Sequence, residues 1–365
     1  MDLSSFTFIM TNDCHFSCSY CYQKKGKKYL DLATAKKAAD FFLPALTRDC
    51  SVNFYGGEPL LAFARIKELF NFIQDKNGRL KKMISYSIST NGDVLDDETI
   101  RFLDEHRFHV LLSFDGLAQD VSRKRGSFAQ IVPVLEKLLR CSGVDLEINS
   151  VFTAQTVEYL YPSVKFIIET GVKNADVSFA NHPSWNTTAI SRLGRELSKV
   201  RRFLVPFSRE RGFIPVSVFR KTSRSGLFGC SAGKDRMALS PDGRLWGCCL
   251  FYDFYRKKEN KSGLKYCFGS LESFMKNQAE VQPQVLDNYS HLTMKHFFTS
   301  ENFCALCEEV DDCSICPVDA ALASSVVGKI SDWDCAIRKS IRRERARFLE
   351  ALEIPVDKSS LRRDA

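Results

Sequence analysis

The chain has 365 residues, of which 44% are hydrophobic and 26% charged, a composition typical of a globular protein. It contains no apolar run of about 18 residues and no basic segment followed by a long apolar one at its start, so we expect neither a membrane span nor a secretion signal. Lys and Arg number 52 against 44 Asp and Glu, giving a net charge of +8, but no nucleic-acid-binding motif accompanies them. We therefore do not expect nucleic acid as a partner. We interpret the basic clusters at residues 24–28 and 338–347 as solvated surfaces, with attraction for an acidic partner as the alternative.

Residues 6–180 alternate short β-branched or aromatic runs with amphipathic stretches. The predicted strands are 6–10, 51–55, 84–89, 109–114, 146–152 and 175–180. The predicted helices are 32–46, capped by Asp31 or Thr34 and ended by Pro44, and then 60–75, 96–106, 128–141 and 157–169. This alternation indicates an α/β fold with a parallel sheet, in which six units form an open, partial (β/α)6 TIM-like barrel. Reactive groups should lie at the carboxyl ends of the strands.

The pattern changes beyond residue 181. A helix is predicted at 190–207 and a short strand at 214–219, and from 226 the chain is rich in Gly, Cys and charge. The predicted domains are a core at 1–190, a linking region at 191–225, a cysteine-rich domain at 226–340, and a basic helix and tail at 341–365.

Fourteen cysteines are too many for an ordinary reduced protein unless most of them bind metal. Three lie within residues 14–21 and nine between 230 and 335. Without a secretion signal we expect a cytoplasmic, reducing location, where clustered thiols are better interpreted as metal ligands than as disulfides. Cys50 and Cys141 stand apart and are predicted to be small buried hydrophobes.

The first cysteine group, Cys14-x3-Cys18-x2-Cys21, directly follows the first predicted strand. Three thiolates on a [4Fe–4S] cluster leave one iron open for a small chelating molecule, whereas a structural zinc normally takes four protein ligands. The spacing and the aromatic Tyr20 resemble the radical S-adenosylmethionine (SAM) superfamily. That resemblance implies that the open iron binds SAM and that the reduced cluster cleaves SAM to a 5′-deoxyadenosyl radical.

Further segments resemble this family at the ends of successive strands: Gly56-Gly57-Glu58-Pro59, Ser89-Thr90-Asn91-Gly92 and Ser113-Phe114-Asp115-Gly116. By position, Arg125 resembles an arginine that pairs with the SAM carboxylate. The His-Asp pair that usually precedes it is replaced by Val121-Ser122, so Arg123 is a rival. The resemblance implies these SAM-binding residues: Tyr20, Gly56, Gly57, Glu58, Ser89, Asn91, Ser113, Asp115, Arg125 and Asn149.

The later cysteines resemble the SPASM extension of radical SAM enzymes, with one departure, an x2 spacing where the family has x3. Ser240-Pro241-Asp242-Gly243 is predicted to be a turn between two strands that brings the flanking cysteines together. The resemblance implies two auxiliary [4Fe–4S] clusters, an outer one on Cys304, Cys307, Cys313 and Cys335 and an inner one on Cys230, Cys248 and Cys316. We predict Cys267 as the fourth inner ligand. The alternatives are an open iron, Cys249, or a pair of zinc sites in place of both clusters.

SPASM enzymes typically modify a peptide or protein, so we expect such a substrate and a crosslinking, oxidation or epimerisation reaction. An electron donor such as flavodoxin or ferredoxin is implied. Asp253 and Tyr252 are candidate acid–base residues, although the sequence FYDFY at 251–255 also favours a half-buried strand. A small-molecule cofactor precursor is an alternative substrate. An anaerobic sulfatase-type maturase is a further alternative, weakened by Cys249 at the position where those enzymes carry an Asp. A non-catalytic electron-transfer or scaffold protein is a third, which the SAM motifs argue against.

Overall fold

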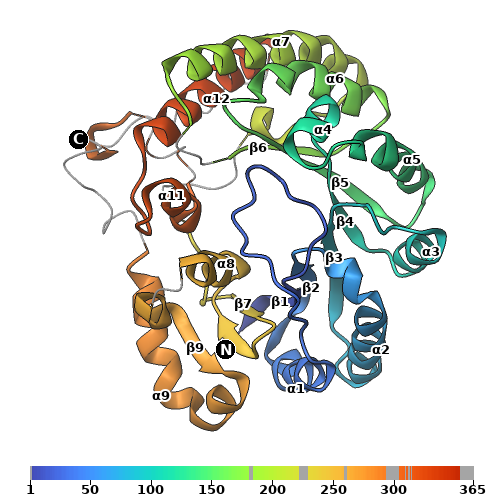
Figure 1. Cartoon of the computed structure of the whole chain (residues 1–365), viewed down its shortest axis with the longest axis vertical. Helices are drawn as coiled ribbons and strands as arrows, with labels where there is room; N and C mark the ends of the chain where they lie inside the picture. The colour runs from blue at the N-terminus through green and yellow to red at the C-terminus, as the bar shows by residue number, and fades with distance from the viewer. Residues whose placement is uncertain are drawn as a thin grey trace.

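The computed structural model describes residues 2–180, 184–221, 229–258, 261–292, 304–308, 310, 313 and 315–353. Its centre is one curved sheet whose strands follow the order β6-β5-β4-β3-β2-β1-β7-β8-β9 (Figure 1). The first six strands are mutually parallel: β1 (Leu3–Thr11), β2 (Leu46–Gly56), β3 (Met83–Thr90), β4 (His109–Ser113), β5 (Asp145–Phe152) and β6 (Ala175–Phe179). The sheet does not close on itself, which confirms the predicted open barrel.

Helices connect these strands and cover the outside of the sheet (Figure 1). They are α1 (Leu32–Phe42), α2 (Phe63–Leu80), α3 (Asp97–Glu105), the short α4 (Gln119–Ser122), α5 (Ser127–Arg140) and α6 (Leu160–Glu169). The local signals act as predicted at α1. Asp31 accepts a hydrogen bond from the Thr34 N–H at 2.9 Å, and the helix ends just before Pro44. The core is continuous under the sheet and includes Cys50, whereas Cys141 is only half-buried.

The cysteine-rich part extends the same sheet. β7 (Arg236–Leu239) pairs in parallel with β1, and β8 (Arg244–Trp246) and β9 (Cys267–Ser270) continue in antiparallel order. The predicted turn at residues 240–243 joins β7 to β8, where the Gly243 N–H donates to the Ser240 carbonyl at 2.9 Å. The remaining helices are α7 (Thr187–Arg211), α8 (Cys249–Lys258), α9 (Leu271–Ser290), α11 (Pro317–Ser324) and α12 (Asp332–Ala351).

Two predictions of local structure are wrong. The segment predicted as a strand at 214–219 forms one isolated bridge from Val216 to Ala175 and then a 3₁₀ turn at Ser217–Phe219. The Ser217 hydroxyl donates to Asp176 at 2.6 Å and accepts from the Val177 N–H at 3.1 Å, so side-chain bonds replace a strand ladder.

The second wrong prediction is the strand at 251–255, which lies inside α8. Phe251, Tyr252, Asp253 and Phe254 are all buried, at 0 to 3% exposure. A short run buried on all sides has no polar alternation, and periodicity alone does not then distinguish a strand from a helix.

Other boundaries bear on the predicted domains. α7 runs without interruption through residue 190. The predicted boundary between residues 225 and 226, and the tail beyond 353, lie outside the described residues. None of the helices in the described ranges is both long and apolar enough to cross a membrane.

Candidate active site

The segment between β1 and α1, residues 12–31, carries the first cysteine group. It leaves the carboxyl end of β1 and lies in the middle of the ring of strands, drawn in dark blue in Figure 1. Cys14, Cys18 and Cys21 are half-buried, and the Cys21 N–H donates to the Cys18 carbonyl at 3.0 Å. Desolvation raises the pKa of Cys18 to about 11, and the neighbouring Cys21 and Cys14 thiols raise it further, against the opposing charge of Arg123. The three thiols therefore share one electrostatic environment.

Within the described ranges, no three His, Cys, Asp or Glu side chains converge as they do around a single metal ion. An iron–sulfur cube has a different requirement, because each thiolate bonds a separate iron at a separate corner.

The turn Gly56-Gly57-Glu58 packs directly onto the segment that carries these cysteines. The Gly57 N–H donates to the Thr11 carbonyl at 2.9 Å, and the Glu58 N–H donates to the Asp13 carbonyl at 2.8 Å. A Cβ atom at Gly56 would lie 2.3 Å from the Thr11 oxygen, and one at Gly57 would lie 2.4 Å from the Asp13 oxygen. In this structure the close approach that the glycines permit is to the chain's own backbone beside Cys14.

Glu58 ties this turn to the end of β3. Its carboxyl group is fully buried and accepts from the Asn91 N–H at 2.7 Å, the Thr90 hydroxyl at 2.9 Å and the Leu60 N–H at 3.1 Å. Desolvation raises the pKa of Glu58 to about 7, and the hydrogen bonds oppose that rise. The Asn91 side chain in turn donates to the Cys14 sulfur at 3.8 Å. The ends of β2 and β3 are thus both connected to the first cysteine.

Asp115 plays the corresponding part at the end of β4. One carboxylate oxygen accepts from the Tyr20 hydroxyl at 2.8 Å and the other pairs with Arg123 at 2.9 Å. The guanidinium of Arg123 also lies 5.4 Å from the centre of the Tyr20 ring, which is cation–π distance. Arg123 is 8% exposed, whereas Arg125 is exposed. The buried cation next to the cysteines is therefore Arg123, the rival of Arg125 in the sequence argument.

The site has unsatisfied polar atoms that suit a bound polar molecule. Asn149 Oδ1 on β5 and Arg123 Nε are buried without a hydrogen-bond partner among the described residues. Ser89 and Ser113 are half-buried at the ends of β3 and β4. Burying such groups unpaired is unfavourable, so a ligand that hydrogen-bonds them fits here. Three free thiols and these polar atoms are a suitable donor set for a cluster and its chelating partner.

The inner set of later cysteines comes together from three points in the fold. Cys248 directly precedes α8, Cys316 is the N-cap of α11, and Cys230 lies shortly before β7. The pKa of Cys248 is raised to about 12, first by desolvation and then by the neighbouring Cys316 and Cys230 thiols, with backbone hydrogen bonds opposing them.

The outer set shows the same mutual influence. Cys313 has a pKa raised to about 11, first by desolvation and then by Cys335, Cys304 and Cys307, with Arg338 opposing them.

Cys267 and Cys249 have different neighbours. Cys267 opens β9 opposite Trp246, and the charges acting on its thiol are Arg244 and Asp242. The Cys248, Cys267 and Cys230 thiols all act electrostatically on the Tyr289 hydroxyl, and the Tyr289 ring packs on Gly247. Cys249 instead shares its surroundings with Cys248 and Asp253.

α8 places Asp253 against the cysteine-bearing segment. The carboxylate is 2% exposed and accepts from the Gln23 side chain at 3.1 Å and the Tyr55 hydroxyl at 3.3 Å. Tyr55 also bonds the Tyr22 hydroxyl at 2.7 Å. Desolvation raises the pKa of Asp253 to about 7. Tyr252, the other predicted acid–base residue, faces Asn12 and accepts from its side chain at 2.8 Å.

Four residues of this site were not predicted from the sequence: Asn12, Tyr22, Gln23 and Tyr55. A signal was present, because Tyr22-Gln23 directly follows Cys21 and Tyr55 directly precedes Gly56. Residues flanking a motif share its position at the end of a strand.

Comparison with known proteins agrees with this geometry. Residues 8–159 match the model of the Radical SAM superfamily. These residues form a radical SAM domain. Members of that superfamily use a [4Fe–4S] cluster and SAM. The structure of native anSMEcpe with bound AdoMet and Cp18Cys peptide has a TM-score of 0.74 at 18% identity, over 97% of this chain and 100% of that one, which shows the same fold.

Relatives in sequence cover different parts of the chain. The radical SAM cyclopropyl synthase TigE of Paramaledivibacter caminithermalis is 22% identical over 342 residues, which are 86% of this chain and 67% of TigE. A cysteine-type anaerobic sulfatase-maturating enzyme of Clostridium novyi is 27% identical over 177 residues, 43% of this chain and 45% of that enzyme. The chain thus spans less than half of the second relative's length.

Proposed function

We propose that this enzyme reductively cleaves SAM to a 5′-deoxyadenosyl radical and uses the radical to modify a side chain of a peptide or protein. The observation that carries the proposal is the position of Asp253. The C-terminal part delivers a buried carboxylate onto Gln23 and Tyr55, which flank Cys21 and Gly56 of the SAM motifs. A side chain that takes part in the reaction of the substrate is expected where the C-terminal part meets the SAM motifs, and Asp253 lies there.

The three cysteines of the first group would hold the cluster that binds SAM, and the surrounding polar residues would orient the SAM molecule. We propose that the SAM-binding residues predicted from the sequence orient the SAM molecule. Arg123 and Asn149 are favoured most for this role, because each has a buried polar atom without a hydrogen-bond partner among the described residues. When bound, the cluster and SAM supply the carbon radical. We further propose one outer and one inner auxiliary cluster on the later cysteines, which predicts about 8–12 iron atoms per chain.

Asp253 is proposed to accept a proton. A side-chain oxidation or crosslink that starts with loss of a hydrogen atom must next lose a proton and an electron. A carboxylate whose pKa is raised to about 7 is suited to take that proton near neutral pH. Gln23 and Tyr55 hold the carboxylate in place, and the hydrogen bond between Tyr252 and Asn12 fixes α8 against the same segment.

A peptide substrate is supported by the peptide bound in one solved structure, and TigE supports radical SAM chemistry over most of the chain. TigE is named as a cyclopropyl synthase and matches 86% of this chain, and the anSMEcpe structure contains a peptide in a protein of the same fold. A sulfatase-type maturation, the oxidation of a Cys or Ser side chain, is the second candidate. It is favoured by the position of Asp253 on α8, four residues and about one helical turn after Cys249. The helix therefore supplies a carboxylate near the position at which those maturases have an Asp.

The test uses anaerobically reconstituted enzyme with SAM, dithionite and any short peptide that is found to be encoded beside its gene, read by mass spectrometry. A crosslink or oxidation removes two hydrogen atoms from the peptide, whereas epimerisation leaves its mass unchanged and alters its hydrolysed stereochemistry. A sulfatase-derived peptide containing Cys is the parallel substrate for the second candidate. Cleavage of SAM with no change in either peptide, together with turnover of a cofactor precursor, would refute the peptide proposal. The Asp253→Asn variant is the matched control for substrate chemistry.

A further inference from the structure

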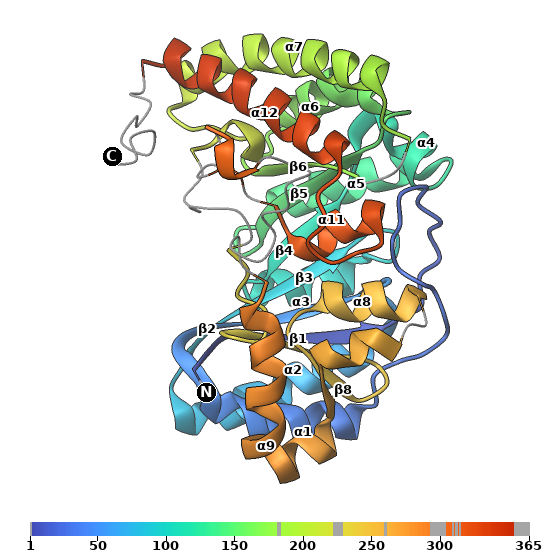
Figure 2. The same ribbon diagram turned by 90° about the vertical axis from the view of Figure 1, so that its left-hand side faces the viewer.

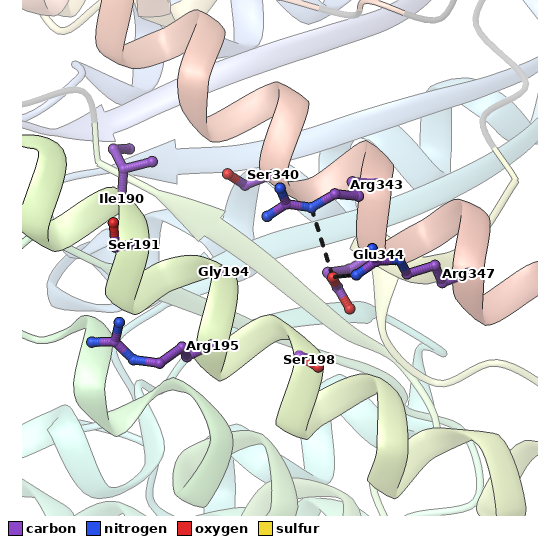
Figure 3. A pocket seen from close by; sticks show the side chains of 9 residues that line it. All are labelled: Ile190, Ser191, Gly194, Arg195, Ser198, Ser340, Arg343, Glu344 and Arg347. Atoms are coloured by element: carbon purple, nitrogen blue, oxygen red, sulfur yellow. Dashed lines mark hydrogen bonds and ion pairs between the residues drawn. The ribbon is translucent and has the colours of Figure 1, made fainter.

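The two long helices α7 and α12 lie side by side (Figure 2), and residues of both helices line a groove between them. The groove is a hollow of about 420 Å³. Figure 3 shows Arg195 on α7 and Arg343 and Arg347 on α12 among the residues that line this hollow. Serine hydroxyls from both helices complete a lining suited to carboxylates: Ser191, Ser198 and Ser340.

The one acidic residue in the lining is already neutralised. Glu344 is 2% exposed, and its carboxylate pairs with Arg201 at 3.0 Å and with Arg347 at 2.8 Å. Arg343 lies only 3.8 Å from the same carboxylate, but its guanidinium extends toward Gly194 on α7. Among the residues that the structure describes, Arg195 has no carboxylate within ion-pair distance. The groove therefore has an excess of exposed positive charge.

The basic surface continues along α12 to the outer cysteines. Cys335 lies in the first turn of α12, and Ser340 follows it by five residues, or about 7.5 Å along the helix axis. Arg338 and Lys339, between the two, are exposed and lie close enough to act electrostatically on the Cys313 and Cys304 thiols. We call this surface, made of Arg195, Lys339, Arg343 and Arg347, the α12 basic strip.

We propose that the α12 basic strip is the docking surface for a small acidic electron-transfer protein of the flavodoxin type. This inference rests on the proposed function, which places the outer cluster at Cys335. Each SAM cleaved consumes one electron, which the anionic hydroquinone of a flavodoxin supplies as it becomes the neutral semiquinone. Such partners bind through small, charged interfaces, and complementary charge raises the encounter rate. The basic surface begins beside the outer cysteines. This position suits a partner that delivers electrons better than it suits a peptide substrate.

The experiment measures binding directly, apart from turnover. Fluorescently labelled flavodoxin is titrated with reconstituted holoenzyme by anisotropy, for wild type and for Arg195→Glu/Arg343→Glu. We expect affinity to fall about tenfold in the variant at low ionic strength, and wild-type affinity to fall steeply with added salt. The matched control, Arg79→Glu/Arg101→Glu, reverses two exposed charges on α2 and α3 and should bind as wild type does. Arg195→Gln/Arg343→Gln provides a milder variant if charge reversal beside Glu344 prevents folding.

Activity then separates the two proposals. Dithionite reaches the enzyme without docking, so dithionite-driven formation of 5′-deoxyadenosine should be unchanged in the variant while flavodoxin-driven formation falls. Loss of both would point to a damaged enzyme, and the Gln variant then decides by its flavodoxin affinity. Unchanged flavodoxin binding in a folded variant would overturn the proposal. A second outcome would also overturn it: the variant loses binding of a decaglutamate peptide but keeps binding of flavodoxin. The groove would then be a site for an acidic peptide.

Discussion

The two cysteine regions are built in different ways. Around the first group, contacts come from the ends of three neighbouring parallel strands: Gly57 and Glu58 after β2, Asn91 after β3, and Asp115 after β4. The later cysteines are separated by as many as 335 − 230 = 105 residues and lie at the start of β9, α8 and α11 and within α12. The first site is assembled by the topology of the sheet, because successive parallel strands bring their carboxyl ends to the same edge. The second depends on how irregular segments pack, and only bound metal would join its parts covalently.

The largest expected effect tests whether the first site alone generates the radical. Replacing Cys14, Cys18 and Cys21 by Ala should abolish 5′-deoxyadenosine formation, because no cluster remains to bind SAM. The iron in the later cysteine sets should be retained, because no residue of those sets is changed. Iron analysis and chromatography of the nucleoside measure both. Cys50→Ala, a buried cysteine outside both regions, is the control. Reductive SAM cleavage by the triple variant would remove the assignment of this site.

The next effect concerns proton transfer between the two regions. Asp253→Asn should lower peptide modification by about 100-fold or more while SAM cleavage continues, because general-base catalysis typically contributes that much. The pKa of Asp253 is raised to about 7, so the carboxylate form, and with it the rate of modification, should increase from pH 6 to pH 8. A rate that is flat over this range and unaffected by the Asn substitution would exclude Asp253 as the proton acceptor.

The same group makes a prediction about stability with a definite sign. In the unfolded chain an Asp carboxyl loses its proton near its ordinary pKa of 3.8, while the folded protein keeps the proton up to about pH 7. The folded state binds more protons between these values, so this group favours folding less as pH rises through that window. Asp253→Asn should therefore reduce the loss of stability between pH 4 and pH 7, as measured by denaturant unfolding.

A smaller effect tests whether Gly57 is needed for close packing against the segment that carries Cys14, with a glycine elsewhere in the chain as the control. Gly57→Ala places a Cβ 2.4 Å from the Asp13 oxygen and should displace the backbone next to Cys14, weakening SAM binding. Gly78→Ala, in α2, has no atom within 4 Å of the added Cβ and should stabilise the protein by up to about 1 kcal/mol. Equilibrium SAM binding and thermal unfolding of both variants provide the comparison. Equal SAM affinity in the two would show that the Gly57 turn tolerates a side chain.

The smallest effect concerns the fourth ligand of the inner set. Cys267→Ala should alter the electron paramagnetic resonance signal of one auxiliary cluster, and Cys249→Ala should not. The Cys267 thiol, like the Cys248 and Cys230 thiols, is near enough to Tyr289 to act electrostatically on its hydroxyl. The reverse result would assign the ligand to Cys249. A signal that neither variant changes would mean an open iron.

The sequence alone was sufficient for the core. Short strands alternating with amphipathic helices predicted six parallel strands, and parallel strands bring their carboxyl ends to one edge, so motifs at those ends had to lie together. The cap at Asp31, the helix end before Pro44 and the turn at residues 240–243 were predictable for the same reason, since each depends on residues within a few positions. Such local interactions are present in the sequence pattern itself.

Tertiary structure decided the rest. Only packing made residues 251–255 a helix, because a segment buried on every side shows no period, and only that helix turned Asp253 toward Gln23 and Tyr55. Pairing of β7 with β1, the choice of Arg123 over Arg125 as the buried cation, and the joining of α7 with α12 into a basic groove all depend on contacts between residues far apart in the chain. The free energy of those contacts belongs to pairs of segments, so no single stretch of sequence reveals them.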